Sequence, residues 1–388
     1  MKLLVIGLGQ CGGKIADEFA RLNRRARGQR GIGIITGTFA VNTDVADLSG
    51  LSFIKSDYQH RILIGGQKTS GHGVGKINEL GAEIAKEDGD KIIDTIRTTE
   101  LFPETDAILL VASTAGGTGS GAIPTITQQL KERYREKPIY NLMVLPFQHE
   151  EEVEGRTIYN SATCLKSVYL TADAIFLVDN QRYIRKDFSL TNNLAKINTL
   201  IVEPFYDLLC AGEEKKAKYI GSRMVDAGDI VQTLKGWTTI GHGKSQISLM
   251  KSLFGKRGDF KEKAFETHKG VQAINQAISE LSLQCNPADA SRGLYLLSGP
   301  AKEMDLNMIK EIGFYLKSIA PEAVIRTGDY PREKGSLDVT LILSGLRDVR
   351  KIVDYFTKTI DFISAVRKRK EGIDFAQEQT FTDIPLLL

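Results

Sequence analysis

The segment over residues 107–121, AILLVASTAGGTGSG, decides the fold. It starts with an unbroken apolar run, Ala107 to Ala112, and continues into a loop rich in glycine. Helical character follows from Ile123 to Tyr134, with Pro124 in the first turn, where its missing N–H group costs nothing. A short apolar run that ends at glycines is typical of a buried strand. The segment therefore predicts a strand, a loop that can approach an anion closely, and a helix.

A second unit of this kind stands at the start of the chain. Lys2 to Ile6 has the pattern of a buried strand, Lys14 to Leu22 has that of a helix, and the residues between them are GLGQCGG. Bare N–H groups and a helix N-terminus favour phosphate binding there. A dehydrogenase that binds NAD could use the same glycines, but its acidic residue follows ~20 residues later. Asp44, the nearest candidate, stands 32 residues after Gly12. A Walker loop is excluded because Lys14 is followed by isoleucine.

A third glycine-rich segment covers residues 65–75, GGQKTSGHGVG, and contains Lys68. Such a loop is expected to reorganise around a terminal phosphate. A dinucleotide-binding fold needs only one of the glycine loops over residues 7–13 and 113–121. We therefore interpret the two as phosphate-binding loops that face a single ligand. Three glycine loops in one domain argue against three unrelated turns.

The pattern along the chain predicts a doubly wound α/β domain with a parallel sheet, followed by a helical connection and a mixed second domain. Further strands are expected at Ile34 to Val41, Tyr140 to Leu145 and Ala174 to Val178. A long helix is expected from Leu190 to Leu209. In the second half, strands at Gly293 to Ser298 and Leu337 to Ser344 flank a helix at Leu306 to Ala320. The predicted boundaries are 1–188 for the nucleotide-binding domain, 189–212 for the connecting helix, 213–365 for the C-terminal domain and 366–388 for a flexible tail.

Composition narrows the class of protein. The 388 residues carry a net charge of +3 and are 42% hydrophobic, which indicates a globular chain with no preference for nucleic acid. No apolar run approaches the ~18 residues of a membrane span. Cys11, Cys164, Cys210 and Cys285 form no CxxC pair, so we expect a cytoplasmic protein without structural zinc.

The loops resemble those of the tubulin/FtsZ superfamily. Gly9 to Gly12 is similar to the first nucleotide loop of tubulin, and Ala115 to Gly121 is close to the signature GGGTG[ST]G. Ala40 to Asp44 resembles the second loop of FtsZ, and Val178 to Asn180 resembles the segment that contacts guanine. Order and spacing agree from Met1 to about Phe356. The fullest likeness is to the archaeal CetZ family, through Ser113 to Ala115 and Gly71 to Gly75.

This resemblance implies a tubulin/FtsZ-like α/β fold: a Rossmann-like GTPase domain with a parallel sheet, a long central helix and an α+β C-terminal domain. It implies GTP or GDP with Mg²⁺, the metal being held mostly by water and phosphate. Asn180 and Asn198 would contact guanine. Glu154, which Gly155 follows, would contact the ribose, with Glu150 as the alternative. The remaining implied nucleotide contacts are Gly9, Gln10, Cys11, Gly12, Gly13, Asn42, Ala115, Gly116, Gly117, Thr118, Gly119 and Ser120.

The resemblance also places two catalytic carboxylates, Asp226 and Asp229, in the second half. They would act in trans on the nucleotide of the neighbouring subunit in a head-to-tail homopolymer that controls cell shape. From the residues alone, the same pair could simply cap a helix. A division-ring GTPase like FtsZ stays open as an alternative. The tail over residues 366–388 could bind a partner or a membrane, although the basic run at Arg367 to Lys370 is more often a solvated helix end.

Overall fold

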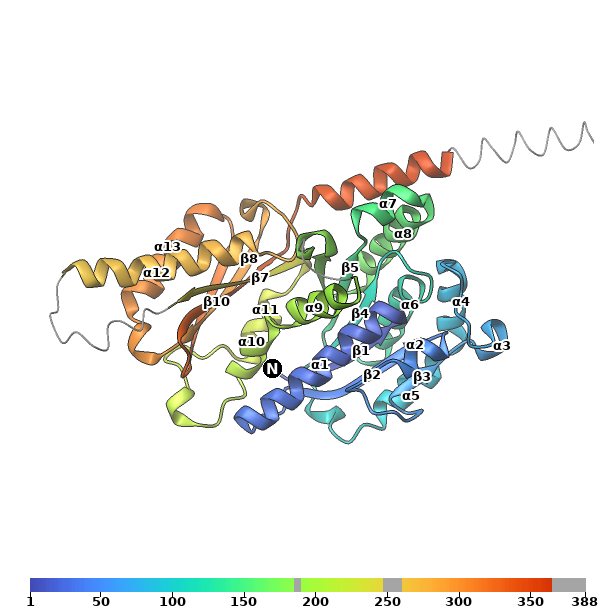
Figure 1. The fold of residues 1–388 in the computed structure, drawn as a ribbon, viewed down its shortest axis with the longest axis horizontal. Helices are drawn as coiled ribbons and strands as arrows, with labels where there is room; N and C mark the ends of the chain where they lie inside the picture. Colours follow the sequence, from blue (N-terminus) through green and yellow to red (C-terminus); the bar gives the residue numbers. More distant parts are fainter. Residues whose placement is uncertain (185–189, 247–259, 365–388) are drawn as a thin grey trace, which may run out of the picture.

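The computed structural model describes residues 1–184, 190–246 and 260–364, and shows one large sheet with helices on both faces (Figure 1). The strands are β1 Leu3–Leu8, β2 Ile35–Asn42, β3 Arg61–Leu63, β4 Ala107–Ser113, β5 Ile139–Leu145, β6 Ala174–Asp179, β7 Gly236–Gln246, β8 Arg292–Gly299, β9 Val324–Pro331 and β10 Ser336–Ser344. The helices are α1 Gly9–Arg30, α2 Val45–Ser49, α3 Gly66–Thr69, α4 Asn78–Glu87, α5 Gly89–Arg97, α6 Thr118–Arg133, α7 Gln148–Val153, α8 Gly155–Thr171, α9 Leu190–Val202, α10 Phe205–Ala211, α11 Ala227–Thr233, α12 Phe260–Ser279 and α13 Leu306–Ile319. Residues 350–364 are helical as well.

The strand order is β3-β2-β1-β4-β5-β6-β7-β10-β8-β9. The strands from β3 through β7 run parallel, whereas β10 runs antiparallel to β7 and β8, and β9 parallel to β8. After β1 the chain builds β2 and β3 on one side and then returns to place β4 on the other. In such sheets a ligand binds where the order reverses, at the carboxyl ends of the strands. The α/β fold expected from the sequence is confirmed.

Two hydrophobic cores lie on the two faces of the sheet, because successive side chains of a strand point in opposite directions. In β1, Leu4 and Ile6 belong to one core and Leu3 and Val5 to the other. The first core also takes apolar side chains from α4, α5, α6, α8, α12 and α13, and the second from α1, α9 and α10. Both cores extend across both halves of the chain. The predicted domain boundaries stay predictions.

The predicted connecting helix is divided. α9 ends at Val202 and α10 begins at Phe205, with Pro204 at the N-cap of α10. Proline has no N–H group and its ring clashes with the preceding helical turn, so a helix breaks there. α1 and α6 begin earlier than predicted, inside their glycine loops. β3, β7 and β9 were not predicted. The predicted tail lies outside the described residues.

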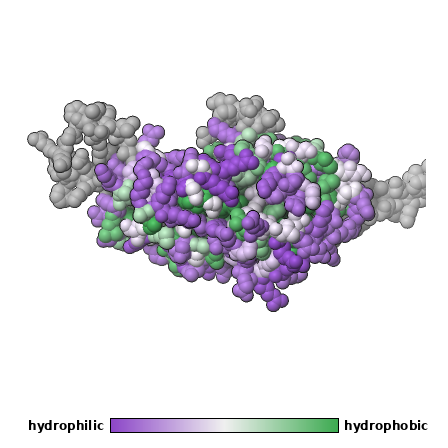
Figure 2. Space-filling model, turned by 90° about the horizontal axis from the view of Figure 1, so that it is seen from below, coloured by the Kyte–Doolittle hydropathy of each residue, from purple (hydrophilic) through white to green (hydrophobic). Residues whose placement is uncertain are grey.

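The surface is mainly polar. Figure 2 shows a face on which hydrophilic residues predominate, interrupted by smaller hydrophobic areas. Within the described ranges, no helix is both long enough and apolar enough to cross a membrane.

Candidate functional site

A cavity of about 450 Å³ lies at the carboxyl ends of β1, β2, β4 and β6, where the strand order reverses. Most of the predicted contact residues line it, although they come from segments far apart in the sequence. These residues are Gly9, Gln10, Cys11, Asn42, Ala115, Gly116, Gly117, Thr118, Gly119, Asn180 and Asn198. The structure therefore brings both glycine loops and both predicted asparagines to one site.

The two glycine loops touch. Gly9 has a left-handed backbone, φ 71°, and a Cβ atom built on it would lie 2.9 Å from the Gly119 nitrogen. A side chain at Gly9 would thus be strained and would press on the other loop. α1 starts at Gly9 and α6 at Thr118, so two helix N-termini meet at the cavity. Free N–H groups and the helix dipole make such ends favourable for anions.

Buried hydrogen bonds hold the second glycine loop in place. The Asn160 side chain is fully buried, and its amide donates to the carbonyl oxygens of Lys76, Ala115 and Gly116 at 2.9, 3.0 and 3.1 Å. The Ser120 hydroxyl also donates to the Gly116 carbonyl, and Ser120 does not line the cavity. These two side chains therefore hold the loop from behind the cavity.

Gly12 and Gly13 lie beneath the cavity and do not line it. A Cβ atom on Gly12 would stand 2.1 Å from the Val111 carbonyl oxygen, so α1 packs directly on β4 at this residue. Burial raises the pKa of the Cys11 thiol to about 12, which keeps it protonated at neutral pH. We interpret Gly12 as a packing position that brings α1 close to the sheet.

Acidic and amide side chains form one rim of the cavity. Gln10 Nε2 donates to Asp47 Oδ1 at 2.7 Å, and Asn42 Nδ2 donates to Asp47 Oδ2 at 3.0 Å. Asp44 caps α2, and both aspartates line the cavity. Within the described residues, no three His, Cys, Asp or Glu side chains are placed to hold a metal ion by themselves. Oxygen ligands completed by water are what Mg²⁺ prefers, so these carboxylates fit the ion.

The opposite side of the cavity carries Asn180, Asn198 and Glu150. Asn180 begins the turn after β6, and the Asp179 carboxylate caps this turn by accepting from the Gln181 N–H group at 3.1 Å. Glu154, the glutamate chosen from the sequence, does not line the cavity, whereas the alternative Glu150 does. The reason is α7, which places Glu150 in its first turn, while Glu154 follows the helix and forms an ion pair with Lys76.

The structure adds residues that the sequence analysis did not select, among them Lys14, Lys76 and Thr157. The Thr157 side chain is 1% exposed, and its hydroxyl has no hydrogen-bond partner in the described part of the chain. Lys14 directly follows the first glycine loop, and this position alone could have identified it. Lys68 lies outside the cavity and pairs with Glu83 and Glu87 at 2.6 Å each, and its expected role at a terminal phosphate stays a prediction.

Asp226 and Asp229 lie outside this cavity and do not line it. Asp226 caps α11, its Oδ1 accepting from the Asp229 N–H group at 2.9 Å, while Asp229 Oδ2 accepts from the Asp226 N–H group at 3.4 Å. Asp226 is exposed and Asp229 is half-buried. Asp229 also lies 3.6 Å from the Arg326 guanidinium. The capping role is present, and it leaves carboxylate oxygens accessible on the surface.

Comparison with known proteins assigns both halves of the chain. Residues 2–186 match the Tubulin/FtsZ family, GTPase domain, and residues 187–361 match the Tubulin-like CetZ, C-terminal domain. The chain belongs to the tubulin-like CetZ family. The tubulin-like protein CetZ1 of Haloferax volcanii is 33% identical over 367 residues, which cover 91% of this chain and 90% of that protein. The resemblance seen in the sequence is confirmed.

Solved CetZ structures share the fold. The structure of Haloferax volcanii CetZ1 as a GDP-bound monomer has a TM-score of 0.78 at 30% identity, covering 93% of this chain and 99% of CetZ1. CetZ2 of the same organism, as a GTPγS-bound protofilament, has a TM-score of 0.81 at 26% identity, covering 95% and 100%. Because residues 187–361 match the C-terminal domain of CetZ proteins, the alternative of an NAD-binding dehydrogenase has no support.

Proposed function

We propose that this CetZ-family protein binds GTP and GDP with Mg²⁺ in the cavity, assembles head to tail, and hydrolyses GTP where two subunits meet. One observation carries the proposal. Both glycine loops converge on a single cavity, whereas the two predicted catalytic carboxylates lie on the surface outside it. The site is therefore complete for binding and incomplete for hydrolysis within one chain.

The cavity suits a guanine nucleotide. Its volume, about 450 Å³, lies in the range of small-molecule sites. The glycine loops and the N-termini of α1 and α6 would hold the phosphates, with Lys14 and Lys76 supplying positive charge. An asparagine amide can both donate to and accept from the guanine edge, which suits Asn180 and Asn198. For the ribose we propose Glu150 in place of Glu154, because only Glu150 lines the cavity.

Asp44 and Asp47 would bind Mg²⁺, in part through water. The ion would neutralise charge on the β- and γ-phosphates during phosphoryl transfer. The residues of this chain would bind the nucleotide and exclude solvent from it.

For hydrolysis, a water must be oriented in line with the terminal phosphate. Asp226 and Asp229 would do this for the next subunit, because neither reaches the cavity of its own chain. A head-to-tail contact uses two different surfaces and so generates an open polymer. The protofilament found for CetZ2 supports this arrangement.

Mixing two inactive variants tests the shared site. D229N keeps the cavity and removes one carboxylate charge. G116L fills the cavity, since a Cβ atom on Gly116 meets no heavy atom within 4 Å and the fold needs no adjustment. Each variant alone is expected to release phosphate from GTP slowly. An equimolar mixture is expected to regain activity, because the cavity of a D229N subunit then meets the intact acidic face of a G116L subunit.

A mixture no faster than its components, under conditions in which both variants enter polymers by sedimentation, would contradict the trans mechanism. Guanine nucleotide binding is tested separately, by chromatography of the nucleotide released from denatured wild-type protein. Adenine or nicotinamide species in that extract would contradict the binding assignment.

The cellular role we propose is cytoplasmic, in control of cell shape. The CetZ match over residues 187–361 favours this role over a division ring of the FtsZ type. Fluorescent fusions confined to midcell rings would favour the division role instead.

A further inference from the structure

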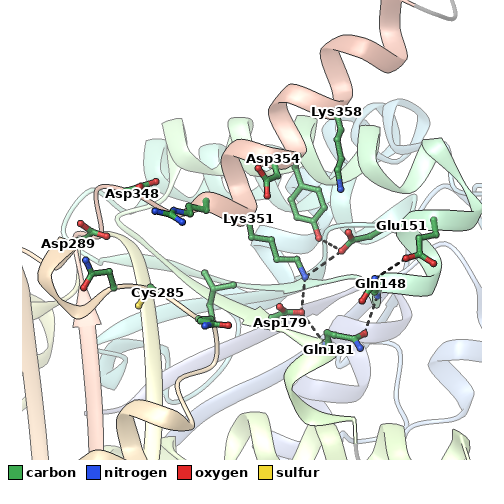
Figure 3. A pocket seen from close by; sticks show the side chains of 16 residues that line it. Gln148, Glu151, Asp179, Gln181, Cys285, Asp289, Asp348, Lys351, Asp354 and Lys358 are labelled. Atoms are coloured by element: carbon green, nitrogen blue, oxygen red, sulfur yellow. Dashed lines mark hydrogen bonds and ion pairs between the residues drawn. The ribbon is translucent and has the colours of Figure 1, made fainter.

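A larger cavity, of about 970 Å³, lies beside α7 and the turn after β6 (Figure 3). These two elements also carry Glu150 and Asn180, which line the nucleotide cavity. One side of it is formed by α7 and by the turn after β6, through Gln148, Glu151, Asp179 and Gln181. The other side is formed by the helix over residues 350–364, through Lys351 and Tyr355. The two cavities thus share the wall made by α7 and the β6 turn. In Figure 1 this helix, in orange-red, lies over α7 and α8.

One face of the 350–364 helix contacts this wall and, farther along the helix, the start of α8. Lys351, Tyr355, Thr359 and Phe362 recur at spacings of four and three, which places them on the same face. The Thr359 hydroxyl donates to the Ile158 carbonyl at 3.3 Å. The Phe362 ring covers Gly155, where a Cβ atom would stand 2.7 Å from the ring. These contacts fasten the helix to the start of α8.

The contacts of Lys351 and Tyr355 reach closest to the nucleotide cavity. Lys351 Nζ donates to Asp179 Oδ1 at 2.9 Å and lies 3.4 Å from Glu151 Oε1. The Tyr355 hydroxyl donates to the same Glu151 oxygen at 2.6 Å. In Figure 3 the Lys351 side chain points toward Asp179 and Glu151.

Both carboxylates lie one residue from the nucleotide cavity. Asp179 caps the turn that begins with Asn180, and Glu151 follows Glu150 in α7. The Gln148 N–H group donates to Gln181 Oε1 at 3.2 Å, which joins α7 to that turn. Asn180 and Glu150 line the nucleotide cavity. A displacement of either carboxylate therefore moves a residue that faces the nucleotide.

The electrostatics make Lys351 important for this wall. The side chains of Asp179 and Glu151 are 13% and 12% exposed, so water screens their mutual repulsion poorly. A single ammonium group contacts both. Without it, two largely buried negative charges would face each other and push α7 and the β6 turn apart.

We infer that the 350–364 helix is a positioning clamp for the guanine side of the nucleotide site, with Lys351 and Tyr355 as its positioning residues. The inference rests on the proposed function, since it concerns the same nucleotide. The clamp acts on the wall that carries Asn180 and Glu150, and leaves the phosphate loops after β1 and β4 untouched. Loss of the clamp consequently weakens base recognition more than phosphate binding.

K351M tests the clamp. GDP and ADP are titrated against a fluorescent GDP analogue, which gives both Kd values for each protein. K351M is expected to weaken GDP binding roughly 2- to 30-fold, the range that coupled positions reach. The ratio of GDP to ADP affinity is expected to fall as well, because the phosphates contact other loops. K351R restores the positive charge and is expected to recover most of the loss.

K358M is the matched control, because Lys358 is exposed, lies on the same helix and lines the same larger cavity. It makes the same change of charge and is expected to bind GDP as the wild type does. Y355F removes only the hydroxyl that donates to Glu151, and it serves as the second test if K351M does not fold. A smaller loss of GDP affinity is expected for it. E151Q combined with K351M removes one of the two facing charges and is expected to regain part of the affinity.

Wild-type GDP affinity and an unchanged GDP to ADP ratio in K351M, or in Y355F if K351M is unfolded, would overturn the clamp. Equal losses in K351M and K358M would overturn it too. If the wild-type protein itself binds no guanine nucleotide, the proposed function fails, and this result is distinguishable from failure of the clamp alone.

Discussion

The nucleotide cavity and the acidic segment over residues 221–229 are built by different means. The two glycine loops of the cavity are closely packed backbone, since a Cβ atom on Gly119 would meet the Leu8 carbonyl oxygen at 2.6 Å. The acidic segment is exposed and is anchored by side chains. Asp329 accepts from the N–H groups of Ser222 and Arg223 at 2.9 and 2.6 Å. The difference teaches that the backbone of one chain builds the cavity, whereas the acidic segment, which we propose serves a second chain, is held in place by side chains.

The largest effect is expected for a substitution in the acidic segment, and it concerns the rate of GTP hydrolysis. D229N should lower GTP hydrolysis by roughly 10²- to 10³-fold, in the range found when a positioned acid or base is removed. GDP affinity should not change, because Asp229 does not line the cavity. Phosphate release under assembling conditions and GDP titration measure the two quantities.

D305N is the control for this prediction. Asp305 caps α13, with its Oδ1 accepting from the Met308 N–H group at 2.7 Å, and it takes no part in the proposed site. Near wild-type hydrolysis is expected. Equal losses in D229N and D305N would show that helix capping, and not the position of Asp229, controls activity.

The next largest effect is expected for glycines at the nucleotide cavity, and it concerns the free energy of unfolding. G12A forces a methyl group against the Val111 carbonyl, 2.1 Å away, and should destabilise the fold by about 3 kcal/mol. G13A is its neighbour and control. There the added Cβ meets its nearest atoms at 3.8–4.0 Å, so the gain in helix propensity of roughly 0.5–1 kcal/mol should be retained. Denaturant unfolding measures both, and similar values for the two variants would refute the packing argument.

A smaller effect is expected at His242 of β7, in the dependence of the free energy of unfolding on pH. Burial lowers the pKa of His242, whose Nδ1 lies 3.2 Å from the Thr340 hydroxyl. The unfolded chain therefore takes up a proton at a higher pH than the folded one. The stability that this provides is present above the unfolded pKa, about 6.5, and is lost as pH falls toward the folded pKa.

H242Q should flatten the fall in unfolding free energy between pH 7.5 and 5.5, by at most ~1.4 kcal/mol per pH unit. H72Q changes an exposed histidine and should leave the slope as in the wild type. A slope unchanged in H242Q would remove this histidine from the pH dependence.

The smallest effect is expected for R326Q. The Arg326 guanidinium lies 3.6 Å from Asp229 Oδ1, and the two side chains are 26% and 39% exposed. An ion pair of this exposure contributes up to ~1 kcal/mol, so hydrolysis should fall no more than about fivefold. R292Q, on the neighbouring strand, loses a bond to the Gln232 carbonyl but no contact with Asp229, and should hydrolyse GTP normally.

The sequence predicted the nucleotide-binding half well because its signals are local. Apolar runs marked β1, β4, β5 and β6, and glycines marked the loops that follow β1 and β4. β7 was not predicted, because its glycines interrupt the apolar pattern that indicates a strand. A Cβ atom on Gly241 or Gly243 would stand 2.1 or 2.0 Å from carbonyl oxygens of α12, so these glycines allow close helix packing. That requirement is set by tertiary structure and leaves no pattern in the strand itself.

Prediction of the site residues was limited in the same way, because local motifs do not carry tertiary information. The glycines and asparagines were predicted from motifs, and most of them meet at the cavity. The choice between Glu150 and Glu154 depended on α7, a short helix in a glutamate-rich stretch that the sequence pattern did not reveal. Thr157 carries no motif, and it became visible as a candidate only through its buried, unpartnered hydroxyl.

The junction between β6 and β7 has a consequence for fragments and hybrids of this chain. Among the described residues, three pairs join the two strands: Ala174 with Gly236, Ile175 with Trp237, and Phe176 with Thr238. A fragment cut near residue 186 would leave β6 as an open, apolar sheet edge, and such edges recruit other strands. We therefore expect the isolated GTPase half to aggregate, as light scattering would detect. Hybrids that exchange second halves between relatives would have to preserve the register of this short pairing in order to fold.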